Sequence, residues 1–349
     1  MAEAAVLRPE PFGQALAWAC RPGDLGASGL LVPAEGEGCW RAFDYLVEAT
    51  TAPVPLPVWE AAFDHAAGVV ERLIIALNAD DAGHHDLALA VVEPLAHTGE
   101  PGAMQIMGYW AEHDGRLIEA EDWHRRAIDA GNTYTLNNLG LLLADQERFE
   151  EAEEFYRRAI DAGDSDALVN LGNLLADRGR FEEAEEFYRR AADVGDTEAL
   201  FNLGLLLADQ ERFEEAEEFY RRAADAGHTR ALNNLGNLLA DQERFEEAEK
   251  VYRRAADVGD TRALNNLGNL LADQERFEEA EKVYRRAIDA GHTNALLGLA
   301  LVCWQQGRRG QAVELVERAV AEFAGAGQEK LRVLAAGLLE LWRAEGDAG

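Results

Sequence analysis

Two amphipathic patterns alternate along most of the chain. In residues 229–241 the apolar positions recur at steps of three and four, which is the spacing of one face of an α-helix. A second stretch, residues 245–255, places Phe, Ala, Val, Tyr and Ala on one face in the same way. The polar sequence DQER lies between the two stretches and predicts a turn, and Gly179 occupies that turn in another copy. Each pair of stretches therefore predicts a helix–turn–helix hairpin.

The hairpin pattern recurs every 32 residues. A glycine that follows leucine, or methionine in the first case, marks this period at Gly108, Gly140, Gly172, Gly204, Gly236 and Gly268. Residues 232–255 and 264–287 are identical. The spacing predicts about eight units between about residue 69 and about residue 323. Because one hairpin cannot bury its apolar face alone whereas stacked hairpins can, the predicted fold is an all-α solenoid.

Small and polar residues predict how each hairpin begins and ends. Gly259 and its equivalents follow the second helix, where glycine readily adopts the left-handed conformation that ends a helix. Thr261 is the predicted N-cap of the next helix. Gly236 indicates a close approach of the two helices within a hairpin, and Tyr252 is expected to fill the space between hairpins.

Composition divides the chain into three parts. Residues 1–60 contain two glycine- and proline-rich stretches and are predicted to form an N-terminal segment of short helix and loop. Residues 61–325 form the predicted repeat solenoid. Residues 326–349 are predicted to form a C-terminal capping helix and tail, because residues 331–342 are apolar over much of their surface.

The repeats resemble tetratricopeptide repeats. The residues that match this family's motif are Leu232, Leu235, Gly236, Leu239, Ala248, Tyr252 and Ala255. The period is shorter than the family's period of about 34 residues, and Asp260 stands where the motif has proline. The linking sequence AADVGDTRALNNLG resembles instead the Sel-one-like branch, so the chain is identified as a hybrid of the two. This resemblance implies a right-handed superhelix whose concave groove is lined by the first helix of each hairpin.

The net charge narrows the range of partners. The chain has 33 Lys and Arg against 65 Asp and Glu, a formal net charge of −32. This surface repels nucleic-acid phosphates and anionic membranes and favours a basic partner. No apolar run approaches the length of about 18 residues that spans a membrane, and the N-terminus lacks a signal-peptide pattern. Three cysteines without regular spacing favour a reducing compartment, so we expect a cytoplasmic protein.

The chain lacks motifs of catalytic and metal sites. There is no phosphate-binding loop with its lysine and no nucleophile elbow. His84 and His85 are adjacent and would point about 100° apart on a helix, and His228 occupies an inter-repeat turn position. The carboxylates of RFEEAEEFYRR lack the histidine partners of a di-iron site, and Glu153 is instead expected to pair with Arg157 on a solvated face. We expect no enzymatic activity, no cofactor and no metal.

The face of each first helix opposite the core stripe carries the candidate binding residues. Asparagine amides can donate to and accept from a peptide backbone, and arginine can hold a carboxylate. A row of aspartates beside them favours basic side chains. A purely structural role for the asparagines, in helix and turn formation, remains an alternative. The predicted peptide-binding residues are Tyr134, Asn137, Phe201, Arg230, Asn233, Asn237, Arg262, Asn265 and Asn269.

Three functional hypotheses are consistent with the sequence. The first is a protein-interaction scaffold that binds a peptide or partner protein in the concave groove. The second is a sensor or regulatory arm that works with a separate NTPase or effector in bacterial signalling or defence, because the order WRAFDYLVEA…VWEAAFDHAA resembles bacterial proteins of that kind. The third, an enzyme within residues 1–60, is disfavoured because the segment is short and rich in loops. The sequence predicts neither the identity of the partner nor the oligomeric state.

Overall fold

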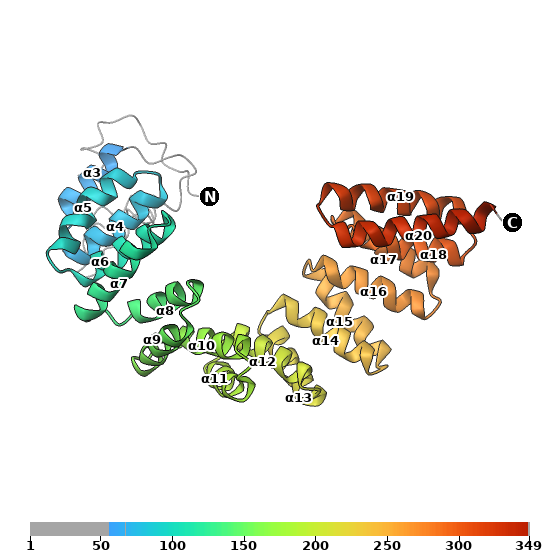
Figure 1. Cartoon of the computed structure of the whole chain (residues 1–349), viewed down its shortest axis with the longest axis horizontal. Helices are drawn as coiled ribbons and strands as arrows, with labels where there is room; N and C mark the ends of the chain where they lie inside the picture. Colours follow the sequence, from blue (N-terminus) through green and yellow to red (C-terminus); the bar gives the residue numbers. More distant parts are fainter. Residues whose placement is uncertain (1–55, 67, 348–349) are drawn as a thin grey trace, which may run out of the picture. The chain divides into compact units, whose positions relative to one another are not determined.

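The computed structural model describes residues 56–66 and 68–347. This part of the chain consists of helices α3 to α20 and contains no β-strand (Figure 1). Its helices fall into two compact units with the boundary between residues 167 and 168, and each unit is described by itself below. The all-α fold class is confirmed, whereas most of the predicted N-terminal segment 1–60 lies outside the described residues.

Unit 1 is a stack of hairpins that begins with an additional helix. The bounds of its helices are α3 (Leu56–His65), α4 (Val69–Asp81), α5 (His85–His97), α6 (Pro101–His113), α7 (Leu117–Asp129), α8 (Thr135–Asp145) and α9 (Phe149–Asp161). Each helix packs against the next one along the chain, and α4 also contacts α6. Large apolar side chains, among them Trp59, Ile75 and Trp110, form the buried core between these helices.

Unit 2 continues the same alternation of helices. The bounds are α10 (Asp166–Asp177), which lies across the boundary, α11 (Phe181–Asp193), α12 (Thr197–Asp209), α13 (Phe213–Asp225), α14 (Thr229–Asp241), α15 (Phe245–Asp257), α16 (Thr261–Asp273), α17 (Phe277–Asp289), α18 (Ala295–Gln305), α19 (Arg309–Gly325) and α20 (Glu329–Asp347). We call the even-numbered helices from α4 to α18 first helices and the odd-numbered helices from α5 to α19 second helices. These pairs correspond to the eight predicted repeats.

Consecutive packing gives each unit the architecture of an α-solenoid. In unit 2, α14 contacts α16 and α16 contacts α18, so successive first helices are neighbours as well as successive hairpins. Helix α20 packs against α19, and its Trp342 stacks on Trp304 of α18 with ring centroids 4.3 Å apart. The predicted solenoid and its C-terminal capping helix are therefore confirmed.

A tyrosine ring lies on the repeated glycine of each central hairpin. A Cβ atom placed on Gly236 would lie 2.4 Å from the ring of Tyr252, and one on Gly268 would lie 2.5 Å from the ring of Tyr284. Tyr284 also contacts Gly298 of the following hairpin. The glycine thus provides the predicted close approach within the hairpin, and the aromatic ring occupies the junction with the next one.

Residues in the left-handed conformation end the helices. Gly259 has a φ of 94°, as expected for its position after a second helix. Within the hairpins the same conformation occurs at Gly179 but also at Glu243, whose φ is 60°. A non-glycine residue in this region costs about 1–2 kcal/mol because its Cβ crowds the following carbonyl oxygen.

The N-cap prediction at Thr261 is wrong by one residue. Thr261 is the first residue of α16, and the side chain of Asp260 caps the helix by accepting a 2.9 Å hydrogen bond from the backbone N–H of Arg262. The left-handed Gly259 leaves room for only one extended residue before the helix begins. In the equivalent place His228 accepts from the backbone N–H of Ala231, which confirms its role as a polar turn residue.

Candidate functional site

We call the side of the first helices that faces away from the second helices the open face. The structure places the predicted residues at different depths on this face. Tyr134 is exposed in front of α8 and Asn137 is buried within α8, both in unit 1. In unit 2, Phe201 and Asn233 are buried and Asn237 and Asn265 are half-buried. The exposed ones are Arg230, Arg262 and Asn269. Whether these residues bind a peptide stays a prediction.

Hydrogen bonds link the asparagines of α14 to those of α16. The Oδ1 atom of Asn237 accepts a 2.7 Å bond from the hydroxyl of Tyr252 and a 3.0 Å bond from Nδ2 of Asn266. The same amide nitrogen of Asn266 also donates to Oδ1 of Asn233 at 3.0 Å. The asparagines therefore have a structural role at the junction of two hairpins, which was one of the alternatives left open by the sequence.

The tyrosine–asparagine bond recurs wherever asparagine follows the repeated glycine in the described residues. Asn173 accepts from the hydroxyl of Tyr188 at 2.7 Å and from Asn202 of the next first helix at 3.0 Å. Asn269 accepts from the hydroxyl of Tyr284 at 2.7 Å. Sequence reasoning did not identify the tyrosines or Asn202 as partners, although their constant spacing from the glycine was a usable signal.

Two asparagine side chains have amide N–H groups that bond no described residue. Among the described residues no acceptor is bound by the Nδ2 atoms of Asn237 and Asn269. Because Tyr252 and Tyr284 hold the side-chain oxygens, each amide is fixed in orientation. Pre-oriented N–H groups at a regular spacing can donate to the carbonyl groups of an extended peptide without a large loss of side-chain entropy.

The two exposed arginines of the open face have partners within unit 2. Arg230 pairs with Glu198 at 3.1 Å, and its guanidinium lies 4.5 Å from the centre of the Phe201 ring. His228 stacks on the same ring at 4.4 Å, so Phe201 is only 4% exposed. Arg262 instead pairs with Asp260 at 3.1 Å. The two arginines occupy equivalent positions but have different partners. The repeat before Arg230 provides a carboxylate and an aromatic ring, whereas the repeat before Arg262 provides neither.

Aspartates at the ends of the first helices remain exposed. They have no ion-pair partner in the part of unit 2 that the structure describes, and they are Asp177, Asp209, Asp241 and Asp273. Burial raises the pKa of Tyr220 to about 12, and the negative charge of Asp209 contributes to this increase. The aspartates thus place uncompensated negative charge near the tyrosine–asparagine junctions.

A second row of charges links the second helices. Arg244 pairs with Glu217 of the preceding hairpin at 2.5 Å and with Glu247 of its own hairpin at 2.8 Å. The i,i+4 pairs predicted from the sequence are also present, as between Glu153 and Arg157 at 2.8 Å. Sequence reasoning missed the links between hairpins, because the two residues of each pair are 27 positions apart and meet only once the hairpins stack.

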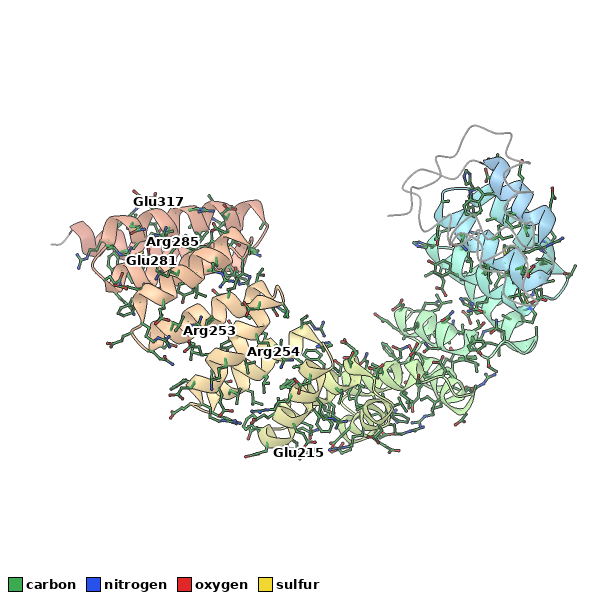
Figure 2. The ribbon with its side chains drawn as sticks, turned by 180° about the vertical axis from the view of Figure 1, so that it is seen from behind. Glu215, Arg253, Arg254, Glu281, Arg285 and Glu317 are labelled. Carbon is green, nitrogen blue, oxygen red and sulfur yellow. The ribbon has the colours of Figure 1, made fainter. Side chains whose placement is uncertain are left out.

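The same link recurs at one junction of unit 1 and at three further junctions of unit 2. The arginine at the end of the DQER-type turn is the donor each time, in the pairs Arg148–Glu121, Arg212–Glu185, Arg276–Glu249 and Arg308–Glu281. Glu281 also pairs along α17 with Arg285, and both residues are labelled in Figure 2. These arginines and glutamates satisfy one another, so we assign them to the stability of the stack rather than to a ligand.

Two absences hold for residues 56–66 and 68–347. No three side chains of His, Cys, Asp or Glu lie in an arrangement that could hold a metal ion. None of the helices in this range combines the length and the apolar character needed to cross a lipid bilayer.

Two family models of the tetratricopeptide repeat match the sequence. One matches residues 132–197, 163–227 and 196–259, and the other matches residues 233–294 and 265–327. Together they extend from residue 132 to residue 327, which is more than half of the chain. No curated protein matches the chain in sequence.

Solved structures similar to this chain are helical repeat proteins. A Sel1 repeat protein from Oxalobacter formigenes has 27% identity and a TM-score of 0.49, covering 64% of this chain and 100% of its own. A tetratricopeptide repeat protein from Parabacteroides merdae has 18% identity and a TM-score of 0.46, covering 70% and 98%. YrrB, described as a TPR protein with an unusual peptide-binding site, has 23% identity and a TM-score of 0.40, covering 52% and 97%.

Proposed function

Since this chain belongs to the tetratricopeptide repeat family, whose fold generally serves as a protein-interaction scaffold rather than a catalytic one, we propose that it binds a peptide or partner protein on the open face of its first helices. The proposed site lies on α12, α14 and α16 of unit 2. The observation that supports it best is the row of exposed, unpaired aspartates next to fixed asparagine donors.

The spacing of the aspartates indicates the form of the ligand. Asp209, Asp241 and Asp273 occupy the same position in successive first helices. Packed helices lie about 8–10 Å apart, and an extended peptide rises about 3.3 Å per residue. Successive aspartates therefore match basic residues at every third position of an extended segment. The amides of Asn237 and Asn269 would donate to the backbone of that segment.

The arginines of the open face favour the same ligand. Arg230 and Arg262 already pair with Glu198 and Asp260, so a carboxylate ligand would have to replace an existing partner. A basic side chain meets no such competition at Asp241 or its equivalents, and the net charge of −32 attracts it over a longer range. The proposed partner is a basic, extended segment of a protein.

The proposal is tested with the full chain and defined peptides. A fluorescent 12-residue peptide with lysine at every third position is compared with a peptide of the same composition whose lysines are consecutive. We expect the first peptide to bind more tightly, by fluorescence anisotropy at low salt, and its affinity to decrease as salt rises. The double variant Asp241→Asn and Asp273→Asn should weaken its binding about 10-fold or more.

The control for this experiment removes the same charge elsewhere. Glu246→Gln and Glu278→Gln change exposed carboxylates on the second helices by the same net amount. Equal losses of affinity in the two double variants would show that net charge alone attracts the peptide, and the proposed site would be wrong. The sensor-arm hypothesis rests on sequence that lies mostly outside the described residues, and it stays a prediction, as does the cytoplasmic location.

A further inference from the structure

The open face of unit 1 is apolar at the register where α10, α14 and α16 carry asparagine and where α12 and α18 carry leucine. Leu77 of α4, Tyr109 of α6 and Leu141 of α8 occupy the register of Asn237, one residue after the repeated small residue. They are 38%, 49% and 43% exposed. Tyr134 adds a further exposed aromatic ring at the start of α8. Apolar side chains repeated at one register in consecutive first helices form a continuous row rather than scattered surface residues.

A row of carboxylates runs beside this apolar row. Asp80 of α4 and Glu112 of α6 stand one helical turn further along, where the later first helices have alanine, as at Ala144 and Ala240. Each carboxylate is bonded to a histidine of the same hairpin. Nδ1 of His85 lies 2.7 Å from Asp80, and Nε2 of His124 lies 2.7 Å from Glu112. The side chain of Glu112 is 30% exposed, so it is held in place without being removed from solvent.

The hydrogen bond from His124 fixes the orientation of the Glu112 carboxylate. His124 is fully buried and takes the place of the repeated tyrosine, with its ring against Gly108. Its Nδ1 atom has no hydrogen-bond partner among the described residues. Nε2 is assigned as the donor to Glu112, because a proton on Nδ1 would be buried without an acceptor. The bond from His124 uses one acceptor position of the carboxylate, and the partial exposure of Glu112 leaves other positions accessible to a ligand.

We propose that the open face of α4, α6 and α8 is a docking surface for an amphipathic, basic segment of a partner protein. Apolar side chains of that segment would cover Leu77, Tyr109 and Leu141, and a lysine or arginine would pair with Glu112 and Asp80. A second copy of this chain fits the surface poorly, because it brings a further net charge of −32 to a row of carboxylates. This surface is separate from the site proposed on unit 2.

The test uses substitutions that the chain itself supplies. Random 12-residue peptides displayed on phage are selected against the full chain, and selected peptides are synthesised for fluorescence anisotropy. We expect peptides with alternating apolar and basic residues, and an affinity at least 10-fold lower for the double variant Tyr109→Asn and Leu141→Asn. This variant introduces the residue found in the same register on α14 and α16. Leu205→Asn, the same change on α12, is the matched control and should leave these peptides unaffected.

The carboxylate is tested separately. Glu112→Gln should weaken a selected peptide about 10-fold, and the effect should vanish for the version of the peptide whose lysine is replaced by glutamine. Thermal unfolding of each variant, followed by circular dichroism, identifies losses of affinity that come from misfolding. If the double variant is unfolded, Glu112→Gln alone tests the docking surface.

Three results would overturn the inference. The first is the absence of any peptide sensitive to Tyr109→Asn, including the case in which residues 1–55 of this chain already cover the surface. The second is a dimer in sedimentation analysis that Tyr109→Asn dissociates, since the occupant would then be a second copy. The third is a set of peptides that depend on Asp241 but not on Tyr109, which would leave the site on unit 2 standing.

Discussion

The hydroxyl of Tyr252 donates a 2.7 Å hydrogen bond to the side-chain oxygen of Asn237, while the ring of the same tyrosine lies on Gly236. One residue of the second helix therefore packs against the first helix and fixes the orientation of an amide on the open face. Burial raises the pKa of Tyr252 well above its usual range, so the hydroxyl remains protonated, and a donor, at neutral and moderately alkaline pH. The stability of the stack and the geometry of the proposed site are thus linked through this residue.

Removing the hydroxyl should destabilise the protein without disturbing the ring. For Tyr252→Phe we expect the free energy of unfolding in urea to fall by about 1 kcal/mol, because Asn237 loses a hydrogen bond at a half-buried position. Tyr156→Phe is the matched control, since Leu141 stands where the asparagine would be and no described residue bonds the hydroxyl. Its effect should be close to zero, and equal effects for the two variants would contradict the role assigned to the bond.

The repeated glycine should not tolerate a methyl group while the tyrosine is present. A Cβ atom at position 236 would lie 2.4 Å from the ring of Tyr252, so Gly236→Ala should lower the free energy of unfolding by about 1–3 kcal/mol. In the background of Tyr252→Ala the same substitution should become neutral or stabilising, because alanine favours the helix. Gly310→Ala on α19 is the control, since no atom lies within 4 Å of the added carbon. A destabilisation that is independent of Tyr252 would contradict the contact.

The repeat pattern predicted the architecture because the fold depends on helix-forming patterns within short stretches of sequence. Apolar stripes at helical spacing and the glycine every 32 residues determine which faces are buried, and the eight hairpins follow from them. The position of the N-cap was less accessible, because Asp260 and Thr261 are both good caps and the choice depends on the backbone conformation of Gly259. A local rule cannot decide between two such adjacent residues.

The sequence predicted residues of the open face but not the side-chain contacts that they make. The sequence identified Asn237 and Asn269 as residues of that face, and the structure shows that tyrosine hydroxyls already use their oxygens. The sequence did not predict that the guanidinium of Arg230 would cover the ring of Phe201. That contact joins two successive repeats, and a pattern read within one repeat contains no information about side chains that meet across the junction.

Among the described residues, four glutamates have a left-handed backbone, and glycine at these sites should stabilise the protein. For Glu243→Gly we expect a gain of about 0.5–1 kcal/mol in the free energy of unfolding, because relief of the Cβ clash exceeds the entropy that glycine adds to the unfolded chain. Gly179 already occupies this position in another repeat, and Gly179→Glu should have the opposite effect. Glu246→Gly, within α15, should instead destabilise by about 1 kcal/mol. A loss of stability in Glu243→Gly, measured by urea unfolding, would contradict the strain assigned to this turn.

The links between second helices should make the stack sensitive to acid. The hydrogen bond from Arg212 lowers the pKa of Glu185 below its ordinary value of 4.5, so this carboxylate binds protons less readily in the folded state than in the unfolded one. Its contribution to stability is therefore complete above pH 4.5 and is lost as the pH falls through the lower, folded value. The difference in unfolding free energy between wild type and Arg212→Gln should be constant at neutral pH and should shrink below pH 4.5. Lys250→Gln removes an exposed charge without an ion pair and should give a difference that changes little over the same range. If the Arg212→Gln difference also stays constant down to pH 3, the pairing of Arg212 with Glu185 does not stabilise the stack.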